Sequence, residues 1–246
     1  MSFTVMTYNV GNGRASPVRL VKTLRACTAD IVALQEVSDA QAQAIRDELS
    51  SCYPHQALFP GGFAGKALLS RFPILRAELL HIGPERPDLE AAVEIEGMAL
   101  TLLNVHPPPP RVRRFSLRFD PHTWNQIETV TSLALKKEPC ILLGDFNLVD
   151  SGREYLHLHH SGLKDAFREA GKGRGLTLPR RIGPWKRLLL INRLIRWAPM
   201  PPLLRVDYIW HTPDLTAEEA WVGEDAGSDH LPVLARMNAN QRISEM

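Results

Sequence analysis

The chain has 246 residues, of which 44% are hydrophobic and 23% are charged, and its formal net charge at pH 7 is +2. These values are typical of globular proteins, leave one large domain or two small ones open, and exclude a polycation, so any basic surface must be local. Three cysteines without a CxxC spacing argue against a disulfide framework and a structural zinc site. No apolar run approaches the ~20 residues that span a bilayer, and the N-terminal segment favours a strand over a signal peptide.

The first half of the chain alternates predicted strands and helices. Runs of β-branched, aromatic and apolar residues favour strands, and apolar residues at helical spacing favour helices. We expect strands at 3–10, 31–34, 67–69, 91–96 and 99–105, and helices at 16–29 and 38–49. The proline run 107–110 stiffens the loop that leaves the last of these strands.

The second half continues the same pattern. We expect a helix at 124–135, a strand at 140–143, a short helix within 153–170, and strands at 203–210 and 231–237. The run at 140–143 is apolar throughout, which suits a strand buried on both faces. Asp207 stands in the middle of its predicted strand, where a buried carboxylate needs a partner. The polar tail from residue 238 is expected to fray.

Polar side chains stand where most of these strands begin or end. They are Asn9, Glu36, His106, Asp145, Asn147, Asp229 and His230. Taken singly, each is an ordinary turn or rim residue, so the signal lies in their recurrence. Strand ends gathered at one edge of a sheet are a common place for a site. Because side chains alternate along a strand, Asp145 and Asn147 are expected on the same side, about 7 Å apart.

Seven motifs follow one another along nearly the whole chain: TYNVGNG, LQEV, LLSRFPI, LLNVHP, LLGDFN, RVDYIW and GSDHLPV. In this order and spacing the chain resembles the endonuclease/exonuclease/phosphatase superfamily, whose fold is DNase I-like. The resemblance implies an α/β (α+β) fold, a four-layer αββα sandwich of two packed mixed β-sheets flanked by helices, with the site at one edge. It also implies phosphoester hydrolysis that usually depends on Mg²⁺ or Mn²⁺.

The resemblance also implies a metal site. Glu36 matches the metal-binding glutamate of the family, Asn9 matches the asparagine that helps to hold the metal or the phosphate, and Asp229 matches a carboxylate near the metal. The residue chemistry agrees, because carboxylates are the hard oxygen ligands that suit Mg²⁺.

The same resemblance assigns the catalytic residues. Asp145 matches the aspartate that positions or deprotonates the attacking water, Asn147 the amide that contacts the phosphate, and His230 the catalytic histidine, which Asp207 holds. His106 matches a second histidine of the DNase I and sphingomyelinase branches, whereas apurinic-site nucleases carry a tyrosine in that region. A neighbouring carboxylate raises the pKa of a histidine and fixes its tautomer. Which of Asp145 and His230 takes the proton of the water stays open.

Basic residues mark candidate substrate contacts. Arg71, Arg111 and Arg114 are predicted to bind the substrate, and Lys66 could meet a phosphate beside Arg71; the alternative is that these are plain surface charges. The segment 179–204 carries six basic residues, two tryptophans and no acidic residue. Three interpretations of it remain open: an interfacial membrane element, a nucleic-acid contact, or an amphipathic helix packed on the domain.

We therefore expect a single domain over 1–246, a Mg²⁺- or Mn²⁺-dependent phosphodiesterase that acts on an anionic phosphoester, with nucleic acid as the favoured substrate. The alternatives are a phospholipid or sphingomyelin phosphodiesterase, a phosphoinositide phosphatase, and a non-catalytic membrane-binding module. We expect no obligate protein partner and a cytoplasmic location, with peripheral membrane association if 179–204 binds lipid.

Overall fold

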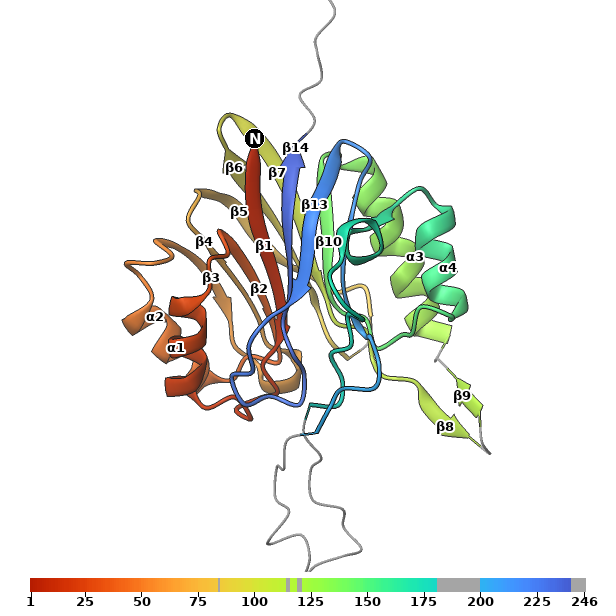
Figure 1. Cartoon of the computed structure of the whole chain (residues 1–246), viewed down its shortest axis with the longest axis horizontal. Helices are drawn as coiled ribbons and strands as arrows, with labels where there is room; N and C mark the ends of the chain where they lie inside the picture. Colours follow the sequence, from red (N-terminus) through yellow and green to blue (C-terminus); the bar gives the residue numbers. More distant parts are fainter. Residues whose placement is uncertain (84, 114–115, 119–120, 181–199, 240–246) are drawn as a thin grey trace, which may run out of the picture.

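The structure is a computed structural model that describes residues 1–83, 85–113, 116–118, 121–180 and 200–239, with the backbone alone at 111–113 and 116–118. Among these residues, two sheets of six strands pack face to face (Figure 1). The first sheet has the strand order β13 (Leu215–Val222), β14 (Val233–Ala239), β1 (Ser2–Asn9), β2 (Ile31–Gln35), β4 (Lys66–Ser70) and β3 (His55–Phe59). The second has the order β11 (Lys164–Asp165), β12 (Asp207–His211), β10 (Cys140–Asp145), β7 (Met98–Val105), β6 (Asp88–Ile95) and β5 (Ile74–Leu80).

Both sheets are mixed. β1 runs parallel to β2, and β10 runs parallel to β7, while the remaining described pairs within the two sheets are antiparallel. A separate two-stranded hairpin, β8 (Arg111–Arg113) and β9 (Ser116–Arg118), projects beside the second sheet (Figure 1).

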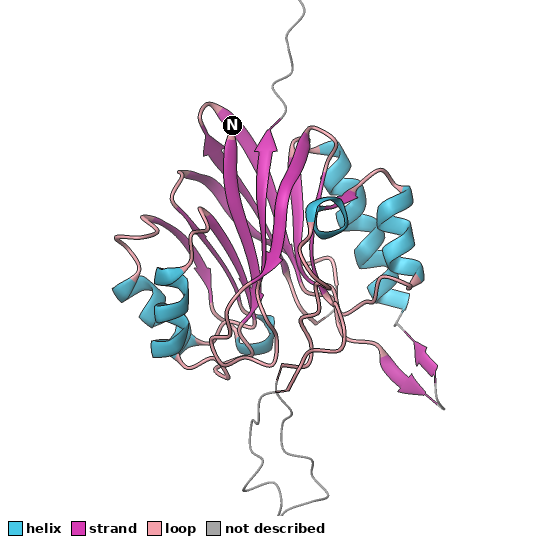
Figure 2. Cartoon of the chain, viewed as in Figure 1, coloured by secondary structure: helices cyan, strands magenta, loops and turns pink. Residues whose placement is uncertain are grey.

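Helices cover the outer faces of both sheets and complete the four layers (Figure 2). α1 (Pro17–Ala26) and α2 (Asp39–Glu48) cover the first sheet, and α3 (Pro121–Lys136) and α4 (Arg153–His160) cover the second. A short helix, α5 (Ala166–Ala170), packs against β12 and β13, and a single 3₁₀ turn, η1 (Gly62–Ala64), precedes β4. Ser16 caps α1, and Ser38 forms a capping box with Gln41 at the start of α2.

The apolar strands are buried on both faces, which explains their lack of polar alternation in sequence. In β10, Ile141 and Leu143 pack between the two sheets, whereas Cys140 and Leu142 pack beneath the outer helices. The same alternation divides β1, β2, β7 and β12 between an inter-sheet core and an outer core.

The predicted sandwich of two mixed sheets flanked by helices is confirmed, and every predicted strand and helix has a counterpart within a few residues. Six strands were missed: β3, β5, β11 and β13 in the two sheets, and β8 and β9 in the separate hairpin. The four sheet strands each lie at an edge of their sheet and are only partly buried, so none shows the apolar run or strict alternation by which strands are found in sequence.

Three details of the prediction are wrong. Asp207 is the first residue of β12 and not the middle of a strand, because the chain before it runs outside the sheet. Asn238 does not begin a frayed tail, since β14 extends to Ala239 and pairs Asn238 with both Ser2 and Thr216. Asn147 does not continue β10, as shown below. Most of the segment 179–204, at 181–199, lies outside the described residues, as does 240–246.

None of the helices in the described part of the chain has the length and apolar character needed to cross a membrane.

The inter-sheet core predicts a specific loss of stability. Leu102 on β7 is 1% exposed and lies between the sheets, so Leu102→Ala should lower the free energy of unfolding by about 2–5 kcal/mol, because it removes buried apolar surface and leaves a cavity. Leu75→Ala on the edge strand β5, where the side chain is 56% exposed, is the matched control and should cost less than about 0.5 kcal/mol. Urea unfolding followed by circular dichroism measures both, and equal losses would contradict the assigned core.

Candidate active site

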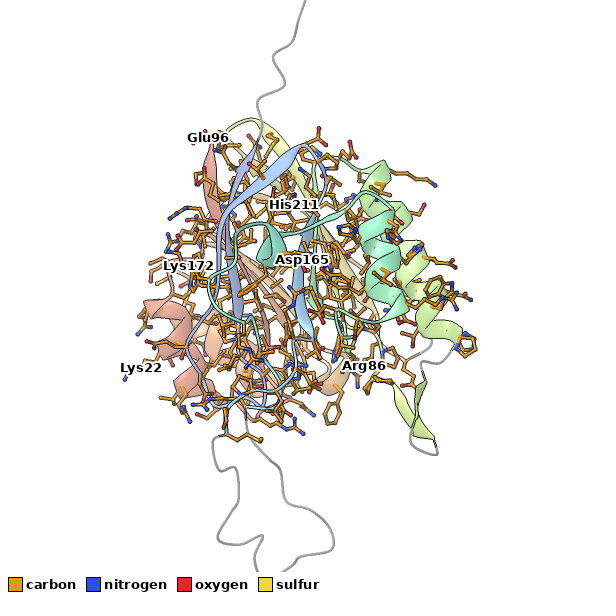
Figure 3. All side chains as sticks on the ribbon, turned by 45° about the vertical axis from the view of Figure 1, so that its right-hand side comes forward. Lys22, Arg86, Glu96, Asp165, Lys172 and His211 are labelled. Carbon is orange, nitrogen blue, oxygen red and sulfur yellow. The ribbon has the colours of Figure 1, made fainter. Side chains whose placement is uncertain are left out.

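The polar residues singled out in sequence meet at one edge of the sandwich. β1, β2, β7 and β10 end at this edge, while β12 and β14 begin there. In register, Asn9 lies beside Gln35 and Asp145 lies beside Asp207. Arg86, just before β6, marks this end of the molecule, and Glu96, in the turn after β6, marks the opposite end (Figure 3).

The strand alternation continues to this edge and aims polar side chains between the sheets. The positions that carry apolar residues in the middle of the inter-sheet core carry polar ones at its end. We call these residues the inter-sheet polar layer: Asn9, Gln35, Lys66, Asn104, Asp145 and Asp207. Gln35 Nε2 donates to Asn104 Oδ1 across the sheets at 2.8 Å, which ties the layer together beneath the site.

Two glycines allow the strands to present their terminal carboxylates. Gly144, with φ of +150°, lies so close to β7 that a Cβ would stand 1.9 Å from the Val105 carbonyl oxygen. Gly65 lies against the chain after Glu36, where a Cβ would stand 2.1 Å from the Val37 carbonyl oxygen. Side chains at these positions would push Asp145 and Glu36 out of place.

Asn9 joins the carboxylates of the two sheets. Its Nδ2 donates to Asp145 Oδ2 at 2.9 Å and to Glu36 Oε1 at 3.3 Å, while its Oδ1 accepts from the Gly11 backbone N–H. Asn9 therefore positions the two carboxylates, and its contact with a metal or a phosphate stays a prediction. Glu36 has a left-handed φ of +57°, and burial raises the pKa of its carboxyl.

A row of three charged groups lies beside Asn9. His230 Nδ1 is 2.9 Å from Asp207 Oδ2, and His230 Nε2 is 3.6 Å from Asp145 Oδ2. Burial opposes a charged imidazole, but the carboxylates of Asp207 and Asp145 outweigh it and raise the pKa of His230 to about 10. Burial also acts to raise the pKa of Asp145, yet His230, His106 and Asn9 together hold it well below its usual range. At neutral pH the site thus presents an imidazolium next to an ionised carboxylate.

His106 is buried on the other side of Asp145. Its Nε2 lies 3.3 Å from Asp145 Oδ2 and 2.5 Å from Arg86 Nη1, so it can donate to the carboxylate or accept from the guanidinium, one at a time. Burial, with the nearby cations Lys66 and Arg86, lowers the pKa of His106 to about 4, which keeps the ring neutral. Asp88 Oδ1 accepts from the His106 backbone N–H and fixes the chain there.

Asp229 and Asn147 lie at the rim. Asp229 forms an ion pair with Arg14, and its neighbour Ser228 donates to the Asn9 carbonyl oxygen at 2.7 Å, which fastens this loop to β1. Asn147 has a left-handed φ of +54°; its backbone N–H turns back to Asp145 Oδ1 and its Nδ2 donates to the Pro107 carbonyl oxygen at 3.0 Å. The expected strand alternation between Asp145 and Asn147 is therefore wrong, although both face the site edge.

The structure does not bring Arg71 to this site. β4 runs antiparallel to β2, so Arg71 lies near the start of β2, where it pairs with Asp30 at 3.1 Å, and not near Glu36. The structure therefore separates Arg71 from the other predicted site residues and gives no support to its predicted substrate contact. The side chain of Arg111 and the whole of Arg114 lie outside the described residues. Lys66 is at the correct end of β4, but it is fully buried, so it is neither a surface charge nor a direct phosphate contact.

Sequence reasoning missed two residues of the site. Arg86 stands in a loop between Pro84 and Pro87 without a flanking strand signal, and Asp88 opens a strand whose apolar part begins later. Only the folded chain shows that Arg86 lies against His106, because the two residues belong to different strand connections.

The residues of the site fit a hard divalent cation. Asp145, Asp207 and His230 offer ligand atoms that lie within 4.8 Å of one another. Asp207 and His230 are already hydrogen-bonded to each other, whereas Glu36 Oε2 is buried and has no hydrogen-bond partner among the described residues. A buried carboxylate oxygen of this kind needs a cation or a donor, and with Asp229 nearby it offers the oxygen ligands that Mg²⁺ and Mn²⁺ accept.

Comparison with protein families gives one match, to the Endonuclease/Exonuclease/phosphatase family, over residues 6–230. The chain belongs to this family. A comparison with curated protein sequences finds no match.

Solved structures of the family share the fold. An endonuclease/exonuclease/phosphatase from Beutenbergia cavernae is 20% identical, with a TM-score of 0.72 over 97% of this chain and 72% of that one. The D. rerio TDP2 structure with a single-strand DNA product is 19% identical, with a TM-score of 0.71 over 97% and 99% of the two chains. A family protein from Bacteroides vulgatus is 16% identical, with a TM-score of 0.69 over 97% and 99%. The expected family and fold are thereby confirmed, and the buried acidic and histidine cluster is in keeping with a metal-dependent phosphoesterase.

The environment of His230 predicts its titration. Because Asp207 is the largest influence favouring the imidazolium, Asp207→Asn should lower the pKa of His230 by about 1–3 units from its value near 10. Long-range ¹H–¹⁵N NMR spectra recorded against pH measure this. Circular dichroism of the two proteins is the control and should be identical, because the substitution keeps the shape of the side chain. A His230 ring that titrates near 6.5 in the wild type would show that the charged row is assigned wrongly.

Proposed function

We propose that the protein is a metal-dependent phosphodiesterase that hydrolyses nucleic acid. The observation that carries the proposal is the row Asp207–His230–Asp145 beside Glu36, whose buried Oε2 has no hydrogen-bond partner among the residues that the structure describes. A phosphodiester is anionic, so attack by water requires charge neutralisation at phosphorus and an oriented nucleophile. The row supplies a cationic donor next to an anionic acceptor, which meets both needs.

The protonation states divide the work between Asp145 and His230. Asp145 is ionised, so it can orient the attacking water and take its proton as the new phosphorus–oxygen bond forms and the bond to the leaving oxygen breaks. Asn9 and the Asn147 backbone N–H hold this carboxylate in place. His230 is protonated at neutral pH, so it cannot take the proton of the water. It instead donates to a phosphoryl oxygen and stabilises the negative charge that develops there. Asp207 keeps the ring charged and oriented.

Glu36 and Asp229 would hold a Mg²⁺ or Mn²⁺ ion, which supplies further positive charge for the phosphoryl oxygens when it is bound. Arg14, now paired with Asp229, and Arg86, beside His106, add cationic side chains at the rim and are matched to a phosphate by their guanidinium geometry.

The choice of nucleic acid rests on two supports. The D. rerio TDP2 structure of the same fold is a complex with single-strand DNA, and this chain carries basic runs at 111–118 and 179–204. The second run also combines tryptophans with an apolar stretch, which favours a lipid phosphodiesterase as the second candidate.

One substrate panel separates these candidates. Purified protein with Mg²⁺ or Mn²⁺ would receive supercoiled plasmid, single-stranded DNA, phosphatidylcholine/sphingomyelin vesicles and bis-p-nitrophenyl phosphate, each with and without EDTA. Cleavage of DNA without release of lipid headgroups supports the proposal. Headgroup release with intact DNA would replace it by the lipid phosphodiesterase, and turnover that survives EDTA would reject the metal.

Removing either reacting group should abolish turnover while the fold persists. Asp145→Ala and His230→Ala should each lower kcat on the order of 10²–10⁴-fold, because one loses the water acceptor and the other the cationic donor. Hydrolysis of bis-p-nitrophenyl phosphate measures the rate, and circular dichroism checks the fold. His160→Ala, on the surface of α4, is the matched control and should keep wild-type turnover. Normal turnover in either site variant would remove that residue from the mechanism.

Arg86, at the site edge, and Arg71, at the far end of β4, make a second pair of test and control variants. Arg86→Ala should raise KM about tenfold or more, because a guanidinium beside His106 is lost from the site edge. Arg71→Ala removes the same side chain from the opposite end of β4 and should leave KM unchanged. Steady-state kinetics on the preferred DNA substrate provide the test; equal effects of the two substitutions would show that Arg86 acts only through net charge.

A further inference from the structure

Lys66 is a lysine that the proposed chemistry leaves unexplained. It is the first residue of β4 and has no exposed surface. Among the described residues, none accepts a hydrogen bond from its ammonium group. A buried ammonium without acceptors is costly, because the charge has lost its water. Negative charges around the ammonium group must therefore compensate its positive charge.

These charges belong to the site. Lys66 lies beside Gln35 in register and on the same strand face as Leu68, so it enters the inter-sheet polar layer from the first sheet. Burial lowers the pKa of Lys66 to about 8, and the carboxylates of Asp88, Glu36 and Asp145 oppose this loss of charge. Because Lys66 is fully buried, its ammonium group cannot contact a bound ion. It can act on the ion only through the electric field of its positive charge.

The charge of the whole site suggests what this field does. The carboxylates that act on His230 or on Lys66 are those of Asp207, Asp145, Asp229, Asp88 and Glu36, and the balance is taken over these groups and the cations that face them. The cationic groups that face them are His230, Lys66, Arg14 and Arg86. The balance is one negative charge, which one divalent cation together with one phosphodiester monoanion neutralises. A second divalent cation would leave the site strongly positive.

We propose that Lys66 is a positioning residue of the metal site: its fixed, buried positive charge weakens the binding of divalent cations and restricts the site to one ion. This inference rests on the proposed metal-dependent function. The positive charge of Lys66 would thereby replace the positive charge of a second metal ion. The competing explanation is that Lys66 serves only as the partner of Asp88 in the folded core.

Binding of Mn²⁺ to the full chain at neutral pH tests the inference without reference to turnover. The electron paramagnetic resonance signal of free Mn²⁺ gives both the dissociation constant and the number of bound ions. Lys66→Met removes the charge at similar volume and should lower the Kd about tenfold and admit a second ion. Lys66→Arg keeps the charge and should retain one ion with a Kd within about twofold of the wild type.

Two further variants protect the test. Lys66→Gln also removes the charge but keeps a polar side chain, and it carries the comparison if Lys66→Met does not fold; it should bind Mn²⁺ about threefold or more tightly than the wild type. Lys137→Met removes a lysine that pairs with Glu90 and should leave Mn²⁺ binding unchanged.

The outcomes separate this inference from the proposed function. One Mn²⁺ ion bound with wild-type affinity by the folded Lys66→Met or Lys66→Gln variant would overturn the role of Lys66 and leave the proposed function intact. A wild-type protein that binds no Mn²⁺, or that binds it equally well as Glu36→Ala, would overturn the metal-dependent function and with it this inference.

Discussion

The hydrogen bond from the Asn9 amide to Asp145 Oδ2 links the last residue of β1 to the last residue of β10, and so joins the two sheets at the site edge. The same amide reaches Glu36, the first residue after β2. Carboxylates from two sheets repel each other when both are ionised and buried. The negative charge of each must therefore be compensated at the site edge. Asn9 holds them at a fixed separation, and His230, held by Asp207, supplies the opposing charge. The geometry of the site depends on this arrangement.

The sandwich explains why such charges can be tolerated here. Deeper in the inter-sheet core the same strand faces carry apolar residues, which pack the sheets together. The polar layer forms where these faces reach the end of the strands, and its members bond across the sheets, as Gln35 does to Asn104. A low-dielectric floor of this kind strengthens every charge interaction above it. It therefore increases the pKa shifts that keep Asp145 ionised, His230 charged and His106 neutral.

Most of the strands and most of the site residues could be predicted from the sequence. The strands buried on both faces are recognisable in sequence as apolar runs. The polar residues at their ends identify the edge of the sandwich at which the site lies. The resemblance of seven motifs to one family predicted the sandwich and the neighbourhood of Asn9, Glu36, His106, Asp145, Asp207 and His230, which the structure brings together. The edge strands β3, β5, β11 and β13 were not predicted, because a short or half-buried strand with one neighbour has no distinctive sequence pattern.

By itself, the sequence determined which residue types stand at the strand ends and hence the kind of chemistry, because strand periodicity and motif order are local properties. Only the tertiary structure decided which basic residues belong to the site. Lys66 is the first residue of β4 and Arg71 directly follows its last residue, and the two looked equivalent in sequence. The antiparallel direction of β4 buries Lys66 beneath the carboxylates and places Arg71 at the far end. Arg86 reached His106 through a loop with no local signal. Direction and proximity of this kind come from long-range pairing of strands, which no single stretch of sequence encodes.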